Sequence, residues 1–227
     1  MVEITIAKLM DNIPLQVDFF PYISKYRRNK ISHYKNEQDC KRSLVAELLM
    51  QKAITEKTGL INAVIYRNPY GKPYVMDKKG FHFNVSHSGD YVAIAVSERE
   101  IGIDIEKKET VDYRVAERFF CEKEVQAIWD CQGEQERNDT FYRIWTLKEC
   151  YVKAIGKGLS IPFSSFEFEI GEKISINLSK QKNRFHFYNT CIQNYQLSVC
   201  YQEDDFDNII HFVCEKQLYD DMRILRK

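Results

Sequence analysis

Residues 81–106 read FHFNVSHSGDYVAIAVSEREIGIDIE and carry a clear strand signal. Apolar and polar residues alternate over 81–85, a dense apolar run covers 91–96, and isoleucine recurs at every second position over 101–105. A period of two is typical of β-strands, and the polar segments between the three runs are typical of turns. We therefore expect three short strands joined as a β-meander.

Helical patterns lie on both sides of these strands. A strand at 2–9 and a basic segment at 25–35 precede a long helix predicted over 37–58, which Gly59 ends as a C-terminal cap. After the meander we predict helices at 113–120, 122–131 and 140–155, then strands at 164–170, 185–188, 195–201 and 209–213. Each half thus has helices before a small antiparallel sheet. This order predicts an α/β (α+β) protein with an N-terminal half at 1–107 and a C-terminal half at 108–227.

Composition limits the cellular setting. The chain has 227 residues, 44% of them hydrophobic, and 33 Lys+Arg balance 33 Asp+Glu. Zero net charge gives no whole-molecule attraction to nucleic acid or membranes, and no apolar run approaches the roughly 18 residues of a membrane span. The seven cysteines are scattered without a C-x-x-C pair, and the N-terminus lacks a signal-peptide pattern. We therefore predict a cytoplasmic protein with free thiols and with no nucleic-acid or membrane partner.

The segment Gly102-Ile103-Asp104-Ile105-Glu106 places two carboxylates on one face of a strand, with two isoleucines on the other. Neighbouring carboxylates repel each other and stay ionised most easily with a cation between them. Hard oxygen ligands suit Mg²⁺. The simpler interpretation is the polar outer face of an antiparallel strand.

A second group lies in WTLKECYVK, residues 145–153. Trp145, Glu149 and Lys153 are four residues apart and share one helix face, where Glu149 can add a third metal oxygen and Lys153 can meet a phosphate. Lys148 lies on a neighbouring face beside apolar residues. The simpler interpretation is an exposed Glu–Lys pair worth a few tenths of a kcal/mol.

Two further segments suit anion binding. In FNVSHSG, residues 83–89, a G-x-S-x-G pattern is absent, so Ser86 and His87 fit a phosphate site better than a nucleophile. A turn with a hydrogen-bonded histidine is the alternative. Gly71-Lys72-Pro73 is a rigid turn that presents one lysine. Together these groups describe a Mg²⁺–polyphosphate site. Another Mg²⁺-dependent phosphotransferase or nucleotide hydrolase is an alternative, although no P-loop or kinase signature is present.

At these residues the sequence resembles the 4′-phosphopantetheinyl transferase superfamily, specifically its larger, monomeric Sfp-type class with two similar halves. The matching segments are GKP at 71–73, FNVSHSG at 83–89, GIDIE at 102–106, RFF…E at 118–124 and WTLKECYVKAIGKGL at 145–159. The resemblance implies two α/β halves related by a pseudo-twofold, with coenzyme A in the cleft between them. It also implies transfer of phosphopantetheine from coenzyme A to a serine hydroxyl of an acyl or peptidyl carrier protein, with release of adenosine 3′,5′-bisphosphate. A non-catalytic coenzyme A-binding relative is the alternative.

The resemblance also implies residue roles. Asp104, Glu106 and Glu149 would hold Mg²⁺, or Mn²⁺ in its place. Glu149, or a water held by the metal, would take the serine proton, with Glu124 as a second candidate, and Lys153 would stabilise the pyrophosphate. Coenzyme A would contact Arg27, Lys30, Arg42, Gly71, Lys72, Pro73, Ser86, His87, Asp104, Lys148 and Lys153.

His87 would lie near the 3′-phosphate. A solvated basic face remains the simpler interpretation of the segment at 25–35. The carrier would dock on residues 111–131, through the apolar residues Val111, Tyr113, Val115 and 119–125 and the basic residues Arg114, Arg118 and Lys123.

Overall fold

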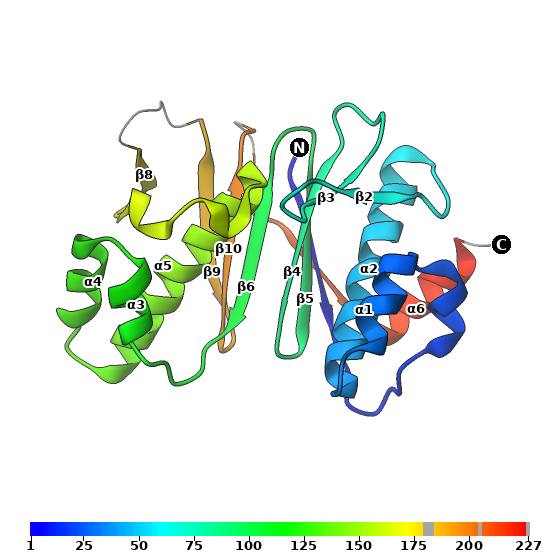
Figure 1. The fold of residues 1–227 in the computed structure, drawn as a ribbon, viewed down its shortest axis with the longest axis horizontal. Coiled ribbons are helices and arrows are strands. Elements are labelled where there is room, and N and C mark those ends of the chain that lie inside the picture. The colour runs from blue at the N-terminus through cyan, green and yellow to red at the C-terminus, as the bar shows by residue number, and fades with distance from the viewer. Residues whose placement is uncertain (179–183, 204–205, 226–227) are drawn as a thin grey trace.

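The structure, a computed structural model, describes residues 1–178, 184–203 and 206–225. Two halves lie side by side, and each consists of a small β-sheet with helices on its outer face (Figure 1). The inner faces of the two sheets meet at the centre of the molecule. The mixed α/β class is as predicted. Within the described ranges, no helix is long and apolar enough to cross a membrane.

The first half contains a four-stranded sheet. Its elements are β1 (Glu3–Lys8), the 3₁₀ helix η1 (Val17–Tyr22), α1 (Lys25–Ser32), α2 (Glu37–Thr58), β2 (Ile65–Arg67), β3 (Pro73–Val75), β4 (His82–Ser88), β5 (Tyr91–Ser97), β11 (Ile210–Cys214) and α6 (Glu215–Ile224). The strand order is β11-β1-β5-β4, and β2 and β3 form a separate hairpin. β11 runs parallel to β1, while the other neighbours are antiparallel. The sheet is therefore mixed, not purely antiparallel as predicted.

The second half contains a three-stranded antiparallel sheet of order β6-β10-β9. Its elements are β6 (Gly102–Lys107), α3 (Arg114–Phe119), α4 (Glu122–Trp129), α5 (Glu134–Ile155), the 3₁₀ helices η2 (Gly158–Ser160) and η3 (Phe163–Ser165), β7 (Phe166–Ile170), β8 (Ile174–Leu178), β9 (His186–Ile192) and β10 (Tyr195–Tyr201). β7 and β8 form a separate hairpin. The long helix α5 packs against β6 and β10, and the shorter helices lie outside it (Figure 1).

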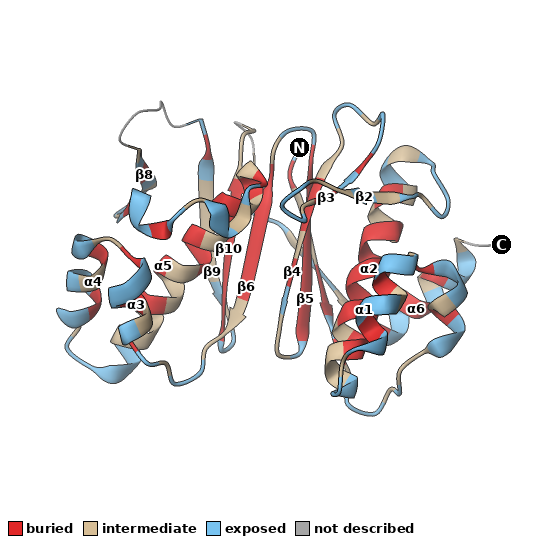
Figure 2. Cartoon of the chain, viewed as in Figure 1, coloured by how far each residue is buried: buried red, intermediate tan, exposed pale blue. Residues whose placement is uncertain are grey.

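A hydrophobic core between the two sheets joins the halves. Ile4 and Ile6 from the first sheet lie in the same buried cluster as Ile103, Ile105 and β10 residues from the second. These isoleucines are completely buried, and Figure 2 shows buried residues along β5, β6 and the inner sides of α2 and α5. Both faces of β5 are covered, which explains its continuous apolar run.

Both halves carry a helix of 22 residues. The prediction over 37–58 is confirmed as α2, which ends at Gly59 with a left-handed φ of 72°. α5 ends at Gly156 with a φ of 77°. It begins at Glu134 instead of the predicted 140, because its first turn is polar and exposed and so shows no apolar periodicity.

The predicted meander is wrong in its third strand. β4 and β5 pair as expected, but β6 pairs antiparallel with β10, with Asp104 opposite Ser198. The chain later returns, because β11 and α6 join the first half. The expected split into 1–107 and 108–227 is therefore corrected: β6 belongs to the second sheet, and the C-terminal strand and helix belong to the first half. The physical reason is burial of both faces of β6, by the central core on one side and by α5 on the other.

Candidate active site

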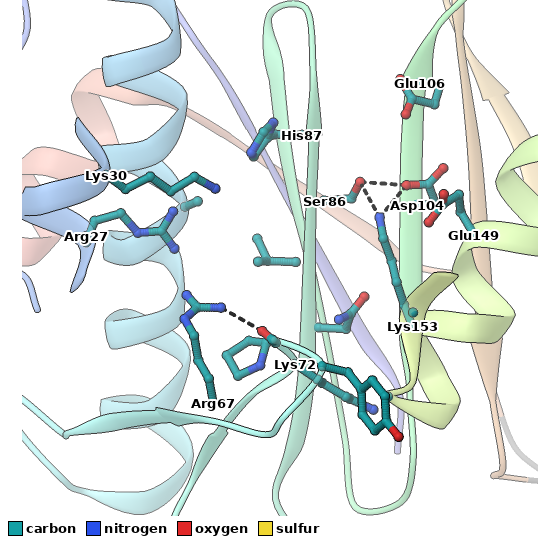
Figure 3. A pocket seen from close by; sticks show the side chains of 18 of the residues that line it. Arg27, Lys30, Arg67, Lys72, Ser86, His87, Asp104, Glu106, Glu149 and Lys153 are labelled. Carbon is teal, nitrogen blue, oxygen red and sulfur yellow. Dashed lines mark hydrogen bonds and ion pairs between the residues drawn. The ribbon is translucent and has the colours of Figure 1, made fainter. Parts of the chain in front are cut away.

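A cavity of about 420 Å³ opens between the two halves (Figure 3). Arg27, Lys30, Arg67 and His87 form what we call the basic wall, and all four come from the first half. Asp104 and Glu106 on β6 and Glu149 on α5 form the opposite, acidic wall. The predicted site residues that line the cavity are Arg27, Lys30, Gly71, Lys72, Pro73, Ser86, His87, Asp104, Glu106, Glu149 and Lys153.

The acidic wall follows from the alternation of β6. Ile103 and Ile105 enter the central core, so Asp104 and Glu106 point the other way, toward the cavity and α5. Asp104 is 1% exposed and accepts a hydrogen bond of 2.8 Å from the Ser86 hydroxyl. Lys153 forms an ion pair of 2.5 Å with the same carboxylate oxygen, and its ammonium lies 3.1 Å from Ser86 Oγ.

Burial and repulsion between carboxylates raise the pKa values of Glu106 and Glu149. Burial, then the Asp104 charge, raises the pKa of Glu106 to about 7. Burial and Asp104 also raise the pKa of Glu149, although Lys153 opposes this. Burial alone would lower the pKa of Lys153, but Asp104 and Glu149 raise it overall. This end of the cavity therefore favours additional positive charge.

The donor chemistry of the acidic wall fits a magnesium ion. Asp104 Oδ2 is buried and has no hydrogen-bond partner, which leaves a carboxylate oxygen for a cation. All three acidic residues supply hard oxygen ligands, which Mg²⁺ prefers. In the part of the chain that the structure describes, no three His, Cys, Asp or Glu side chains already form a complete ligand set. A bound ion would therefore have to draw Glu106 and Glu149 toward Asp104.

The basic wall is built mainly on α1. Ser24 caps this helix by accepting the Arg27 backbone N–H, and Arg27 and Lys30 share a helix face. The Arg27 guanidinium is 3.1 Å from both Glu47 and Ser43, which fixes its position. His87 lines the cavity at the end of β4, and part of its side chain is exposed to solvent.

Partial loss of solvation at the cavity wall, followed by the Lys30 charge, lowers the pKa of His87 to about 4. The ring is therefore neutral at neutral pH.

Arg42 lies outside the cavity lining. Its guanidinium donates to the Gly89 carbonyl at 2.7 Å and pairs with Asp39 at 2.6 Å. It therefore fixes the β4–β5 turn next to His87. The predicted contact between Arg42 and coenzyme A remains a prediction.

Glu124 and Lys148 lie away from the cavity, contrary to their predicted roles. They form a buried ion pair of 2.8 Å, with exposed side-chain fractions of 3% and 0%. Glu124 also accepts the backbone N–H groups of Cys121 and Phe168, both at 2.9 Å. The pair therefore joins α4 to α5 inside the second core. This arrangement gives no support to a proton acceptor at Glu124 or a cofactor contact at Lys148, and both roles stay predictions.

Several lining residues were not predicted from the sequence. Arg67 lies 4.2 Å above the Tyr26 ring and donates to the Gly71 carbonyl at 2.8 Å. No motif surrounds it, so the sequence contains no signal for this position. Asn84 lies within the FNVSHSG segment and accepts the Ile103 N–H at 3.0 Å, which links β4 to β6.

Comparisons with known proteins agree with this geometry. A family model described as the 4′-phosphopantetheinyl transferase superfamily matches residues 100–200, and a model of the N-terminal part of 4′-phosphopantetheinyl transferase matches residues 16–99. The chain is 38% identical over 171 residues to 4′-phosphopantetheinyl transferase gsp of Aneurinibacillus migulanus, covering 73% of this chain and 70% of that protein. It is 32% identical over 205 residues to 4′-phosphopantetheinyl transferase Sfp of Bacillus subtilis (strain 168), covering 88% and 91% respectively. The chain therefore belongs to the 4′-phosphopantetheinyl transferase superfamily.

Proposed function

We propose that this transferase moves phosphopantetheine from coenzyme A to a serine hydroxyl of an acyl or peptidyl carrier protein, in a Mg²⁺-dependent reaction. The released product is adenosine 3′,5′-bisphosphate. The observation that carries the proposal is one cavity with a basic wall on one half and an acidic wall on the other. A ligand with phosphates at one end and a metal-bound pyrophosphate further along needs both kinds of wall.

The basic wall suits the nucleotide end of coenzyme A. Arg27 and Lys30 carry permanent positive charge, and a neutral His87 can donate a ring N–H to the 3′-phosphate. Glu47 holds Arg27 in place, so this cation is already oriented when a phosphate arrives. Preorganised donors cost less to bind than mobile ones.

The acidic wall suits the reacting end. Asp104, Glu106 and Glu149 are the residues that would hold Mg²⁺, which would neutralise charge on the pyrophosphate when bound. Glu149, which lines the cavity in the acidic wall, takes the serine proton.

The serine oxygen then forms a bond to the β-phosphorus of coenzyme A, the P–O bond to the α-phosphate breaks, and adenosine 3′,5′-bisphosphate leaves with that oxygen. Lys153 lies in the same wall and stabilises the phosphate charge.

The carrier protein would dock beside the cavity on α3 and α4. Phe119, Arg118 and Lys123 are exposed there, and the Arg118 guanidinium lies 5.2 Å from the Phe119 ring. Tyr113 and Phe120, expected to contribute apolar contacts, are instead buried in the second core. The apolar part of the proposed docking surface is therefore smaller than the sequence suggested, and the exposed Arg118 and Lys123 would suit the acidic helices of carrier proteins.

The same reasoning extends to assembly and location. Because both walls come from one chain, we propose a monomer. All seven cysteines lie in the described residues and are unpaired there, which supports the proposed cytoplasmic location. Zero net charge supports the proposal that neither nucleic acid nor a membrane is a partner.

A mass-shift assay tests the function. The chain is incubated with coenzyme A, Mg²⁺ and a panel of apo carrier proteins, and the carriers are weighed by intact-mass spectrometry. We expect at least one carrier to gain one phosphopantetheine group, and no gain on any carrier would reject the proposal. Glu149→Gln should abolish transfer while the protein stays folded.

Lys123→Glu tests the docking surface separately. It should raise the KM for the carrier, and an unchanged KM would exclude Lys123 from that surface.

A further inference from the structure

The β2–β3 turn holds the end of α5. The Lys72 ammonium, at the tip of this turn, donates to the Ala154 carbonyl at 2.7 Å and to the Ile101 carbonyl at 3.2 Å, and it pairs with Glu100 at 2.9 Å. The Asn68 side-chain amide donates to the Gly156 carbonyl at 2.7 Å. These bonds cross from the first half of the molecule to the second.

These contacts satisfy groups that a helix end leaves free. The last carbonyls of a helix have no partner within the helix and carry partial negative charge. Ala154 lies in the last turn of α5 and Gly156 caps it. A lysine ammonium has three N–H donors, and three acceptors surround that of Lys72. Its donors are therefore used by protein atoms, which leaves none for the nucleotide contact predicted from the sequence.

The approach is close enough to require a glycine. A Cβ at Gly156 would lie 2.9 Å from Lys72 Cδ and 3.2 Å from Asn68 Nδ2, and the φ of 77° is itself unfavourable for other residues. The turn thus occupies the space that a side chain would fill.

The other side of the same helix turn is fixed against β6. A Cβ at Gly102 would lie 2.0 Å from the Cys150 carbonyl oxygen and 2.5 Å from the Ala154 nitrogen. The end of α5 is therefore held between β6 and the β2–β3 turn. Lys153 belongs to this turn of the helix, and it contacts Asp104, which lies two residues beyond Gly102 on β6.

We propose that Asn68 and Lys72 are positioning residues that hold the end of α5, so that Lys153 and Glu149 keep their places relative to Asp104. This inference rests on the proposed function, because it assigns these two residues to the chemical step of phosphopantetheine transfer. The proposal gives the β2–β3 turn two roles: some of its residues contact the ligand, and others hold the helix. Arg67, Tyr70 and Gly71 face the ligand cavity, whereas the Asn68 amide and the Lys72 ammonium face the helix.

The first test is Lys72→Met, measured by transfer kinetics and by binding of adenosine 3′,5′-bisphosphate in a calorimetric titration. This product carries only the nucleotide end of coenzyme A. We expect kcat to fall at least tenfold and the Kd of the product to stay within twofold of the unsubstituted protein. A Kd that weakens tenfold or more would show a direct nucleotide contact and overturn the proposal, as would an unchanged kcat.

The second test removes one hydrogen bond and keeps the turn. Asn68 Oδ1 accepts the backbone N–H groups of Tyr70 and Lys72, both at 2.9 Å. Asn68→Asp preserves these acceptors but loses the donor to Gly156, and it places a negative charge against a helix carbonyl. We expect the same pattern, with kcat reduced and the product Kd unchanged. This variant decides the question if Lys72→Met does not fold.

Matched controls are Lys57→Met and Asn62→Asp, because both residues are exposed and lie away from the cavity. Both should keep the kcat of the unsubstituted protein. If the unsubstituted protein transfers no phosphopantetheine, the proposed function fails. If it is active and the Asn68 and Lys72 variants behave like the controls, the positioning role alone fails.

Discussion

Replacing Lys148 by methionine should destabilise the protein strongly and leave nucleotide binding intact. The Lys148 ammonium has three buried acceptors: Glu124 at 2.8 Å and the carbonyls of Phe163 at 2.7 Å and Phe166 at 2.8 Å. Methionine has a similar length but no donor. The substitution therefore leaves a buried carboxylate and two buried carbonyls without this partner.

The expected cost follows from this burial. Breaking a buried ion pair by removing one partner costs about 3–5 kcal/mol. For a protein of this size, each kcal/mol lowers the melting temperature by about 2–4 °C. Burial lowers the pKa of Lys148, although Glu124 opposes the shift. Keeping this buried lysine charged therefore costs folding free energy. Adding Glu124→Gln removes the stranded charge, and the double variant should be more stable than Lys148→Met alone.

Urea unfolding followed by tryptophan fluorescence measures these differences. Lys57→Met is the control, because its ion pair with Glu3 is exposed and should change the unfolding free energy by less than about 0.5 kcal/mol. A Lys148→Met protein with unchanged stability and a weakened affinity for adenosine 3′,5′-bisphosphate would refute the structural role. That result would support the contact between Lys148 and coenzyme A that the sequence predicted.

Three further substitutions give independent tests. Gly102→Ala should lower the unfolding free energy by about 1–3 kcal/mol in urea unfolding, and slow transfer, because its Cβ meets the backbone of α5. Ser198→Ala should cost about 1–3 kcal/mol in the same assay, because this fully buried hydroxyl bonds to Thr146 and Asn189. His87 has a pKa of about 4, and a bound phosphate favours its protonated form, so binding takes up a proton. Calorimetry should show adenosine 3′,5′-bisphosphate binding more tightly as the pH falls from about 6 toward about 4, and His87→Gln should reduce this dependence.

The sequence predicted the faces of β6 but not its partner. Alternation is a local property of the strand, so Ile103 and Ile105 were expected in the core, where they lie fully buried. The same alternation suits pairing with β5 or with β10. Choosing β10 requires knowing that α5 covers the other face, with Gly102 as the contact point. That fact depends on packing between distant segments.

The helix α5 shows the same limit. Its period places Trp145, Glu149 and Lys153 along one side, and all three line the cavity. The helical periodicity does not tell whether a neighbouring face of α5 contacts a ligand or packs against the rest of the protein. The Lys148 ammonium donates to the carbonyls of Phe163 in η3 and Phe166 in β7, which come after α5 in the chain. The charged motif around Lys148 therefore gave no sign that this lysine is fully buried.

The exchange of strands between the halves has a consequence for the mechanism. Because β6 crosses into the second sheet, Asp104 and Glu106 share one structural unit with Glu149 and Lys153. A change in the angle between the halves would therefore move the basic wall but keep the acidic residues at constant spacing. The β2–β3 turn is the part of the first half whose Asn68 and Lys72 hold the end of α5. The contact of this turn with α5 therefore aligns a nucleotide on the basic wall with a phosphate at the acidic wall, and the approach of Glu106 and Glu149 to a metal ion takes place within the second half alone, as an in-line displacement at a fixed serine needs.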